Sequence, residues 1–216
     1  MRIDPAGWPF VFGGAALAAL MGLGAGWTWG VAACVLPAFL LFFFRDPHRT
    51  VTARAQDVLS PADGRVMVVG EPIGDFAGTP WQQVSIFLSP MDVHVNRMPV
   101  SGRVTQVRYH PGRFLPAYRR EAGDLNEYTE VTVDVGGRAV IVRQIVGVLA
   151  RRIVCRVREG DVVSAGARFG VMKFGSRMDV FLPAGSTIRV KVGDRVTAAV
   201  TIIAELPPAP SGGPRP

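Results

Sequence analysis

The chain has 216 residues, enough for one domain of ordinary size and an appendage, and its formal net charge is +7. A basic excess favours acidic partners, either nucleic acid or anionic lipid headgroups, although a solvated basic face remains the alternative. The sequence lacks the aromatic-interleaved basic motifs of RNA-recognition sheets, so we expect no nucleic-acid partner. Cys34 and Cys155 lie in apolar surroundings without metal-ligand spacing, which predicts neither a disulfide framework nor a bound metal.

Residues 1–50 are predicted to form a membrane anchor and its basic flank. The segment from Trp8 to Phe44 contains no Lys, Arg, Asp, Glu or His. It is too long for one spanning helix of about 20 residues. No signal-peptide cleavage pattern leads into a polar start. Gly22, Gly24 and Gly26 therefore predict two helices of about 17 residues joined by a tight turn, at the lower limit for spanning. A hairpin that dips into one leaflet is the alternative.

Cationic residues follow the apolar segment. Arg45, His48, Arg49 and Arg54 lie behind it, against Arg2 in front. Because cations that flank membrane segments tend to stay cytoplasmic, we expect both ends of the hairpin and the following domain to lie on the cytoplasmic side of the cell membrane.

Residues 51–206 are predicted to form one β-rich domain. Its β-branched runs, each bounded by Gly, Pro or Asp-Gly, are Val66–Val69, Val84–Leu88, Glu130–Val135, Ala139–Ile145 and Ile188–Val192. Val135-Gly136-Gly137-Arg138 predicts a hairpin turn. Tyr109–Glu127, interrupted by Pro111-Gly112 and Pro116, predicts a flap or one short helix. Residues 207–216 are rich in Pro and Gly and are predicted to be disordered.

A segment near the middle of this domain resembles biotinyl and lipoyl carrier domains. Glu159–Gly166 is followed by Met172-Lys173, although the separation is shorter than in the carrier pattern. We interpret the likeness as shared architecture, a flattened β barrel-sandwich, in which Lys173 is structural or faces the substrate. A membrane-anchored carrier or β-binding module remains an alternative function.

Four blocks carry the chemical signal. They are Phe44-Arg45-Asp46-Pro47, Ser60-Pro61-Ala62-Asp63-Gly64, Met91-Asp92-Val93-His94-Val95-Asn96-Arg97-Met98-Pro99 and Phe174-Gly175-Ser176-Arg177-Met178-Asp179. Each alone is a weak signal, since a Gly-Ser pair usually marks a turn. In this order, from about residue 40 to about residue 205, the blocks resemble the phosphatidylserine decarboxylase proenzymes, in particular their short bacterial and archaeal form.

This resemblance implies a zymogen that cleaves itself between Gly175 and Ser176 into a large β chain and a small α chain. The fragments would stay together as a heterodimer or a higher oligomer. Ser176 would become a covalent pyruvoyl group, and a Schiff base on that group would convert phosphatidylserine to phosphatidylethanolamine and CO2. The chemistry needs such a carbonyl, because CO2 loss from an α-amino acid leaves electrons on Cα. The sequence shows no glycine-rich phosphate cradle for pyridoxal phosphate.

Self-cleavage needs a base for the serine hydroxyl, and a carboxylate commonly orients the base. His94 is the candidate base, because His48 belongs to the basic flank and His110 to a Pro-Gly loop. Asp63 is the candidate orienting carboxylate, although Asp-Gly after Ser-Pro is also an ordinary turn signal. The longer family members carry a second histidine where this chain has Arg97, so His94 alone would serve both steps, or water would take one.

Two arginines are candidates to hold the lipid phosphate, Arg97 and Arg177. Asp92 and Arg97 could equally form a structural ion pair. A serine hydrolase built on Ser176, His94 and Asp63 is the remaining alternative, but the residues around Ser176 lack the Gly-x-Ser-x-Gly elbow.

Overall fold

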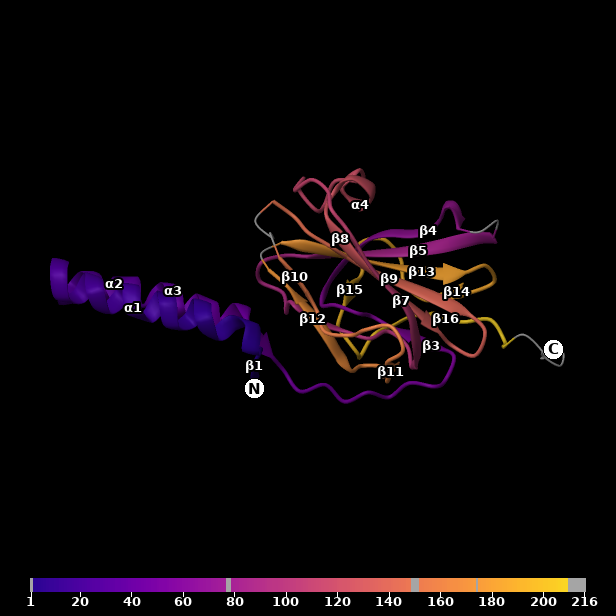
Figure 1. Cartoon of the computed structure of the whole chain (residues 1–216), viewed down its shortest axis with the longest axis horizontal. Coiled ribbons are helices and arrows are strands. Elements are labelled where there is room, and N and C mark those ends of the chain that lie inside the picture. The colour runs from indigo at the N-terminus through magenta and orange to yellow at the C-terminus, as the bar shows by residue number, and fades with distance from the viewer. Residues whose placement is uncertain (1, 77–78, 149–151, 174, 210–216) are drawn as a thin grey trace.

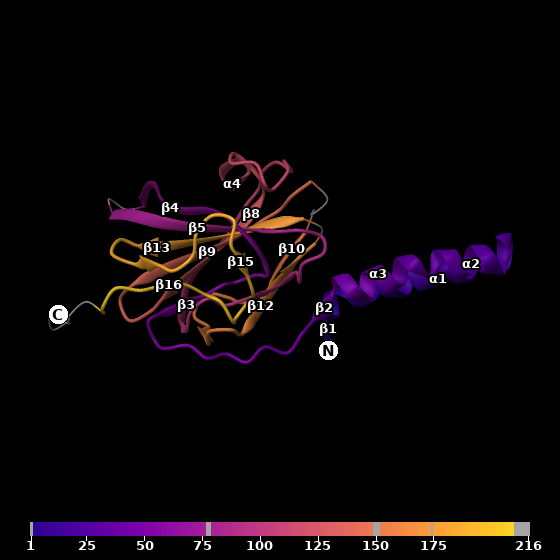
Figure 2. The ribbon, with the colours of Figure 1, turned by 180° about the vertical axis from the view of Figure 1, so that it is seen from behind.

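The computed structural model describes residues 2–76, 79–148, 152–173 and 175–209. A rod of apolar helices projects from a body built almost wholly of β-strands (Figure 1). Viewed from behind, the rod leaves one end of the body and the C-terminal end of the chain lies at the opposite end (Figure 2). The prediction of a mainly β protein with an N-terminal apolar helical segment is confirmed.

The rod is a hairpin of three helices, α1 (Trp8–Ala25), α2 (Trp27–Ala33) and α3 (Val35–Phe43). The chain reverses at Gly26, whose φ of +105° suits a residue without a Cβ. Gly22 and Gly30 bring the two limbs together, since a Cβ at Gly30 would collide with the Cα of Gly22. The predicted turn is therefore present, but the second limb is divided at Cys34. One helix, Pro5–Ala25, is long and apolar enough to cross a membrane by length and composition.

The base of the hairpin is fixed to the body. Strand β1 (Arg2–Ile3) pairs with β2 (Arg45–Asp46), and the side chains of Phe43 and Phe44 are fully buried there. Asp46 accepts a hydrogen bond of 2.7 Å from Arg97 and pairs also with Arg168. The Phe-Arg-Asp-Pro block is thus the joint between rod and body.

The body is organised on one curled antiparallel sheet of eight strands, in the order β11-β7-β8-β9-β13-β5-β4-β15. Their bounds are β4 (Gly64–Phe76), β5 (Thr79–Leu88), β7 (Gly102–His110), β8 (Tyr128–Asp134), β9 (Ala139–Ile145), β11 (Val162–Val163), β13 (Ser176–Pro183) and β15 (Arg195–Val196). Alternate side chains of the central strands enter the main core, including Val142, Met178 and Val180. The next residues along each strand face the opposite side.

Two three-stranded sheets complete the body. The first has the order β10 (Ile153–Cys155), β12 (Arg168–Met172) and β6 (Val95–Arg97), and the second β14 (Thr187–Ile188), β16 (Ile202–Glu205) and β3 (Asp57–Leu59). The strand predicted over Ile188–Val192 is wrong beyond Ile188. The backbone N–H of Lys191 donates to the Asp194 carboxylate and Gly193 has a φ of +95°, so a turn replaces the strand.

Two loop predictions are confirmed. In the hairpin turn, the Val135 N–H donates to the Arg138 carbonyl at 2.8 Å, and Gly136 and Gly137 both have positive φ. The irregular segment contains one short helix, α4 (Ala122–Leu125), on the outside of the body in Figure 1. The prediction of a disordered tail falls largely on residues 210–216, outside the described residues.

Candidate active site

Ser176 is the first residue of β13 and is fully buried. It shares the inner face of the strand with Met178 and Val180, because side chains two apart lie on one face. The next residue, Arg177, faces the other side. Among the described residues, the Ser176 hydroxyl has no hydrogen-bond partner.

The bond preceding Ser176 lies in an unusual backbone environment. Gly175 has a φ of +71°, in the left-handed region that favours glycine. Its carbonyl oxygen lies against Gly147, just beyond β9, where an added Cβ would collide with that oxygen. The carbonyl that self-cleavage would attack therefore sits in a space that exists because position 147 has no side chain. Phe174, in the same block, lies outside the described residues.

His94 is fully buried just before β6. Its Nδ1 lies 3.0 Å from the carbonyl oxygen of Asp92. A carbonyl can only accept, so we assign the hydrogen to Nδ1, which leaves the lone pair of the neutral ring on Nε2. Nε2 has no hydrogen-bond partner among the described residues. Burial lowers the pKa of His94 from 6.5 to about 4, so the ring is neutral at physiological pH.

Backbone pairing links His94 to the segment that leads to Ser176. The Met172 N–H donates to the His94 carbonyl at 3.2 Å, and Val171 pairs with Val95. Three residues separate Met172 from Ser176, so their Cα atoms lie within about 14 Å of each other. His94 is thus held beside the end of β12, and the chain runs from there to Ser176 at the start of β13.

Leaving both groups unpaired is costly. A buried polar atom without a partner costs about 1–3 kcal/mol, and native structures contain few. Buried Ser60 shows the ordinary solution, since its hydroxyl donates to the Ala62 carbonyl at 2.6 Å. Ser176 and His94 therefore differ from an ordinary buried polar residue, in that a polar atom of each lacks a hydrogen-bond partner among the described residues.

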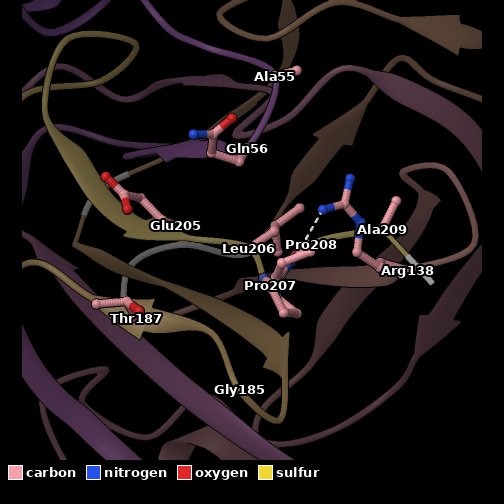
Figure 3. A pocket seen from close by; sticks show the side chains of 10 residues that line it. All are labelled: Ala55, Gln56, Arg138, Gly185, Thr187, Glu205, Leu206, Pro207, Pro208 and Ala209. Atoms are coloured by element: carbon pink, nitrogen blue, oxygen red, sulfur yellow. Dashed lines mark hydrogen bonds between the residues drawn. The ribbon is translucent and has the colours of Figure 1, made fainter. Parts of the chain in front are cut away.

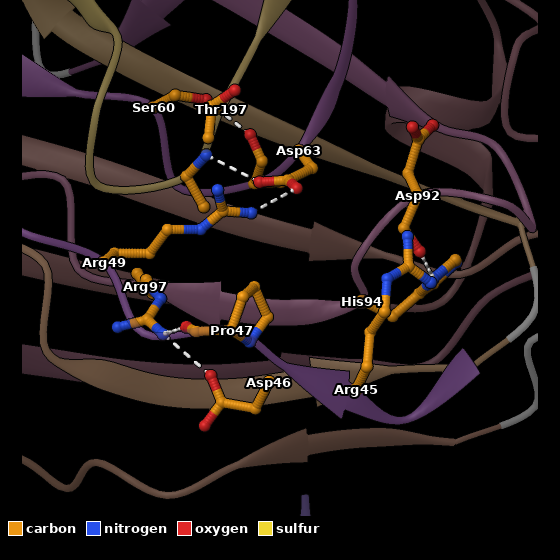
Figure 4. Close-up of polar contacts among 12 residues, drawn as sticks. Arg45, Asp46, Pro47, Arg49, Ser60, Asp63, Asp92, His94, Arg97 and Thr197 are labelled. Atoms are coloured by element: carbon orange, nitrogen blue, oxygen red, sulfur yellow. Dashed lines mark hydrogen bonds and ion pairs between the residues drawn. The ribbon is translucent and has the colours of Figure 1, made fainter. Parts of the chain in front are cut away.

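Asp63 lies in a separate group of contacts (Figure 4). Its carboxylate accepts from Arg49 at 2.7 Å and from the backbone N–H of Ala198 at 2.8 Å. Burial raises the pKa of Asp63, against the opposing effects of the Ala198 hydrogen bond and the Arg49 charge. The structure places no hydrogen bond between Asp63 and His94 among the described residues, and the Asp92 carbonyl orients the imidazole instead.

The two candidate phosphate-binding arginines are both buried and engaged with the protein itself. Arg97 donates to Asp46, to the Pro47 carbonyl and to the Gly166 carbonyl. The alternative of an Asp92–Arg97 ion pair is wrong, because Arg97 pairs with Asp46, whereas Asp92 lies 3.9 Å from Arg195.

On the opposite face of β13 from Ser176, Arg177 forms a bidentate pair with Asp179, at 2.6 and 2.9 Å. It also donates to Ser85 at 3.0 Å.

Two contacts join the site to the base of the hairpin. The ring of Phe43 lies 4.1 Å from the imidazole of His94, centroid to centroid. The ammonium group of Lys173 lies over the ring of Phe10, 4.4 Å from its centroid, and desolvation lowers its pKa. Both contacts bring the hairpin base against the site. Phe43 lies inside an uninterrupted apolar run, so only the three-dimensional fold distinguishes it.

The site is distinct from a cavity of about 560 Å³ near the C-terminal end of the chain (Figure 3). That cavity lies between the 136–138 turn and the strands β14 and β16, and its lining includes Arg138, Thr187 and Glu205. None of the four sequence blocks contributes to it. The described residues also contain no cluster of His, Cys, Asp and Glu side chains that could hold a metal ion.

Known proteins resemble this chain over most of its length. The family model for phosphatidylserine decarboxylase matches residues 36–204. Proteins named phosphatidylserine decarboxylase proenzyme from Nitrosomonas europaea and Burkholderia mallei are 42% and 43% identical, over 92% and 94% of this chain and 93% and 95% of their own length. One from Granulibacter bethesdensis is 46% identical over 94% of this chain and 85% of its own. The chain therefore belongs to the phosphatidylserine decarboxylase family of decarboxylases.

Proposed function

We propose that this chain is a self-processing, pyruvoyl-dependent enzyme that converts phosphatidylserine to phosphatidylethanolamine and CO2. The observation that carries the proposal is a pair of buried groups without hydrogen-bond partners, Ser176 Oγ at the start of β13 and His94 Nε2 just before β6. Gly175, directly before Ser176, has the positive φ that favours glycine. The names of the relatives support it, because a proenzyme requires processing.

Self-cleavage begins when Nε2 of His94 takes the hydroxyl proton of Ser176. The Oγ attacks the Gly175 carbonyl carbon, and the bond from that carbon to the Ser176 nitrogen breaks as the nitrogen receives the proton. An ester between Gly175 and Ser176 results. Removal of the Cα proton of residue 176 then expels Gly175 as a carboxylate and leaves dehydroalanine at position 176. Hydrolysis by water releases the dehydroalanine nitrogen as ammonia and leaves a ketone. Neutral His94 suits the first step, because its lone pair is free at physiological pH.

The surroundings of Ser176 fit a pyruvoyl group. Ser176 is buried, which excludes bulk water, and Lys173, three residues before it, contacts Phe10 at the base of the hairpin. The pyruvoyl carbonyl supplies an electron sink for the electrons that CO2 loss leaves on the serine Cα. His94 is then the group placed to hold the proton that Cα takes up. It would serve both steps, since Arg97 is committed to Asp46.

The hairpin gives the enzyme access to a lipid substrate. Its exposed apolar side chains include Phe12, Leu20 and Trp27, while Arg45 and Arg49 follow it. Apolar residues of this kind are stable in a bilayer, and cations behind them favour an anionic cytoplasmic leaflet. We place the hairpin in the cell membrane and the body on the cytoplasmic side, with the cleaved α and β chains held together by β13, which pairs with β5 and β9.

The other functions lack a supporting contact. A carrier lysine needs an exposed turn, whereas Lys173 is half-buried against Phe10. A hydrolase of the usual triad would need its carboxylate on the histidine, and Asp63 is bound to Arg49 instead. We also propose that the fold of the β-rich body is a flattened barrel-sandwich like that of biotinyl and lipoyl domains.

Fragment analysis of the purified protein tests the proposal. We expect two chains, the smaller one starting at residue 176 and blocked to N-terminal sequencing, with decarboxylation of phosphatidylserine in vesicles. Ser176→Ala should give one intact, folded and inactive chain, and Ser60→Ala, a buried serine whose hydroxyl is already bonded, should still be cleaved. A fully active Ser176→Ala protein would falsify the assignment.

A further inference from the structure

Four buried polar atoms without partners gather at the start of β13. Across the described residues, the buried side-chain atoms that lack a hydrogen-bond partner are Gln82 Oε1, His94 Nε2, Asn96 Nδ2, Gln144 Oε1 and Ser176 Oγ. Apart from Gln82, they belong to the middle of β6, the last two residues of β9, the first residue of β13 and the residue just before β6. Since one such atom already costs about 1–3 kcal/mol, four together indicate a shared purpose.

Asn96 and Gln144 form an amide pair inside this group. Both are fully buried, and the Gln144 Nε2 donates to the Asn96 Oδ1 at 2.8 Å. Asn96 follows His94 by two residues, so in an extended chain their side chains lie on one side. Gly170, on β12, pairs with Asn96, and a Cβ added at Gly170 would collide with Gln144 Nε2. The fold thus leaves room for the amide pair.

Gln144 lies next to Ser176 across the sheet. Gln144 pairs with Met178, two residues beyond Ser176 on the same inner face of β13. Diagonal neighbours of this kind lie about 7–8 Å apart, within reach of a long side chain. The amide pair therefore connects β9, the neighbour of the Ser176 strand, to β6, which begins directly after His94.

The orientation of the pair is fixed by a third group. The Val154 carbonyl lies 3.4 Å from Gln144 Nε2, which identifies that atom as the nitrogen. The Oδ1 of Asn96 accepts from it, so both hydrogens on Asn96 Nδ2 remain for another acceptor. A donor held in this way needs no reorganisation when negative charge develops nearby.

We propose that Asn96 is a catalytic residue of self-cleavage, whose Nδ2 donates a hydrogen bond to the Gly175 carbonyl oxygen as Ser176 attacks and that oxygen becomes negative. Gln144 is its positioning residue and holds Asn96 through Oδ1. The inference rests on the proposed self-processing function and supplies the group that stabilises charge, which His94 and Ser176 do not provide.

Removal of the donor tests Asn96. Asn96→Leu, which keeps the volume, should fold and self-cleave more slowly by on the order of 10²–10³-fold, the usual loss for one oxyanion donor. The rate is measured from freshly purified precursor by gel densitometry, with thermal melting as the check of folding. If Asn96→Leu does not fold, Asn96→Asp, which retains Oδ1 and loses the donor, is measured in its place.

The positioning role of Gln144 predicts a pH dependence that a purely structural residue would not give. In Gln144→Glu, the carboxylate cannot donate to Asn96, so processing should be slow at high pH and recover as the pH falls and the carboxyl is protonated. Gln82→Glu is the matched control, because Gln82 is also a buried amide with an unpaired Oε1 but pairs with Leu182 at the other end of β13. It should process like the wild type across the same pH range.

Two outcomes overturn the inference and are distinguishable. If the wild-type chain is cleaved and the folded Asn96 variant is cleaved within threefold of its rate, the inference fails while the pyruvoyl proposal stands. If the folded wild-type chain is never cleaved, both fail.

Discussion

The ring of Phe43 lies on the imidazole of His94, with centroids 4.1 Å apart and planes inclined by 32°. Phe43 is the last residue of α3 and is fully buried, so the end of the apolar hairpin forms one wall around the candidate base. The base of the hairpin is consequently part of the surroundings of His94, and we expect a change there to alter the properties of the imidazole.

Phe43→Ala should raise the pKa of His94 toward 6.5, because burial is the main cause of its low value. A larger fraction of the ring is then protonated between about pH 4 and 6.5, and self-cleavage should slow in that window while it stays near the wild-type rate at pH 8. The processing rate as a function of pH measures the shift. Phe12→Ala, at an exposed position on α1, is the control and should leave the profile unchanged.

The buried neutral His94 also predicts a pH dependence of stability. The unfolded chain binds a proton at His94 below about pH 6.5, whereas the folded chain does so only below about pH 4. The free energy of unfolding should therefore fall as the pH drops from 6.5 to 4, by up to about 3 kcal/mol. We expect His94→Gln in a Ser176→Ala background to lose this part of the dependence. Urea titrations measure the free energy of unfolding of Ser176→Ala and of the double variant across this pH range. A difference between the two free energies that did not change with pH would contradict the expectation.

The sequence predicts much of this arrangement because its signals are local. The β-branched run Ala139–Ile145 coincides with β9, and Gly136-Gly137 forms the expected turn. Ile188–Val192 has the same composition, but the Asp194 and Gly193 turn ends the strand at Ile188. Local pattern alone does not tell a strand from an apolar turn.

The site is less predictable, since its members come from distant parts of the chain. Ser176 and His94 stand in recognisable motifs, and the fold pairs the segment of His94 with β12, the strand that precedes Ser176. Asp63 also stands in a motif, yet its contacts are with Arg49 and Ala198. Phe43 and Gly147 lack any local pattern, and their importance appears only when the strands are paired.

Gly147→Ala should block self-cleavage. The added methyl group would collide with the Gly175 carbonyl oxygen and displace the bond to be cleaved. Displacement of the reacting atoms by about 1 Å can cost on the order of 10²-fold in rate. Hydroxylamine, which cleaves esters, should release no fragments from this variant if the ester never forms.

Gly102→Ala is the matched control for Gly147→Ala. An added Cβ at Gly102 would collide with the Asp134 carbonyl oxygen in the β7–β8 pair. The Gly102→Ala substitution should lower the melting temperature and still permit self-cleavage. Equal processing of both folded variants would show that Gly147 has no special relation to the cleaved bond.

From the buried ion pair of Arg177 and Asp179, we predict that replacing Arg177 lowers the stability of the protein rather than its affinity for substrate. Their side chains are 3% and 1% exposed, and Gln83 also donates to Asp179 at 2.7 Å. Arg177→Met leaves the Asp179 charge without its cation, which should lower the free energy of unfolding by about 3–5 kcal/mol.

The double variant Arg177→Met/Asp179→Leu decides between the two roles of Arg177. It removes both charges, so most of the lost stability should return. If Arg177 is only structural, the double variant should self-cleave and show the wild-type KM for phosphatidylserine in vesicles. A stable, processed double variant whose KM is raised tenfold or more would instead assign Arg177 to the lipid phosphate, because stability and binding are then separated in one protein.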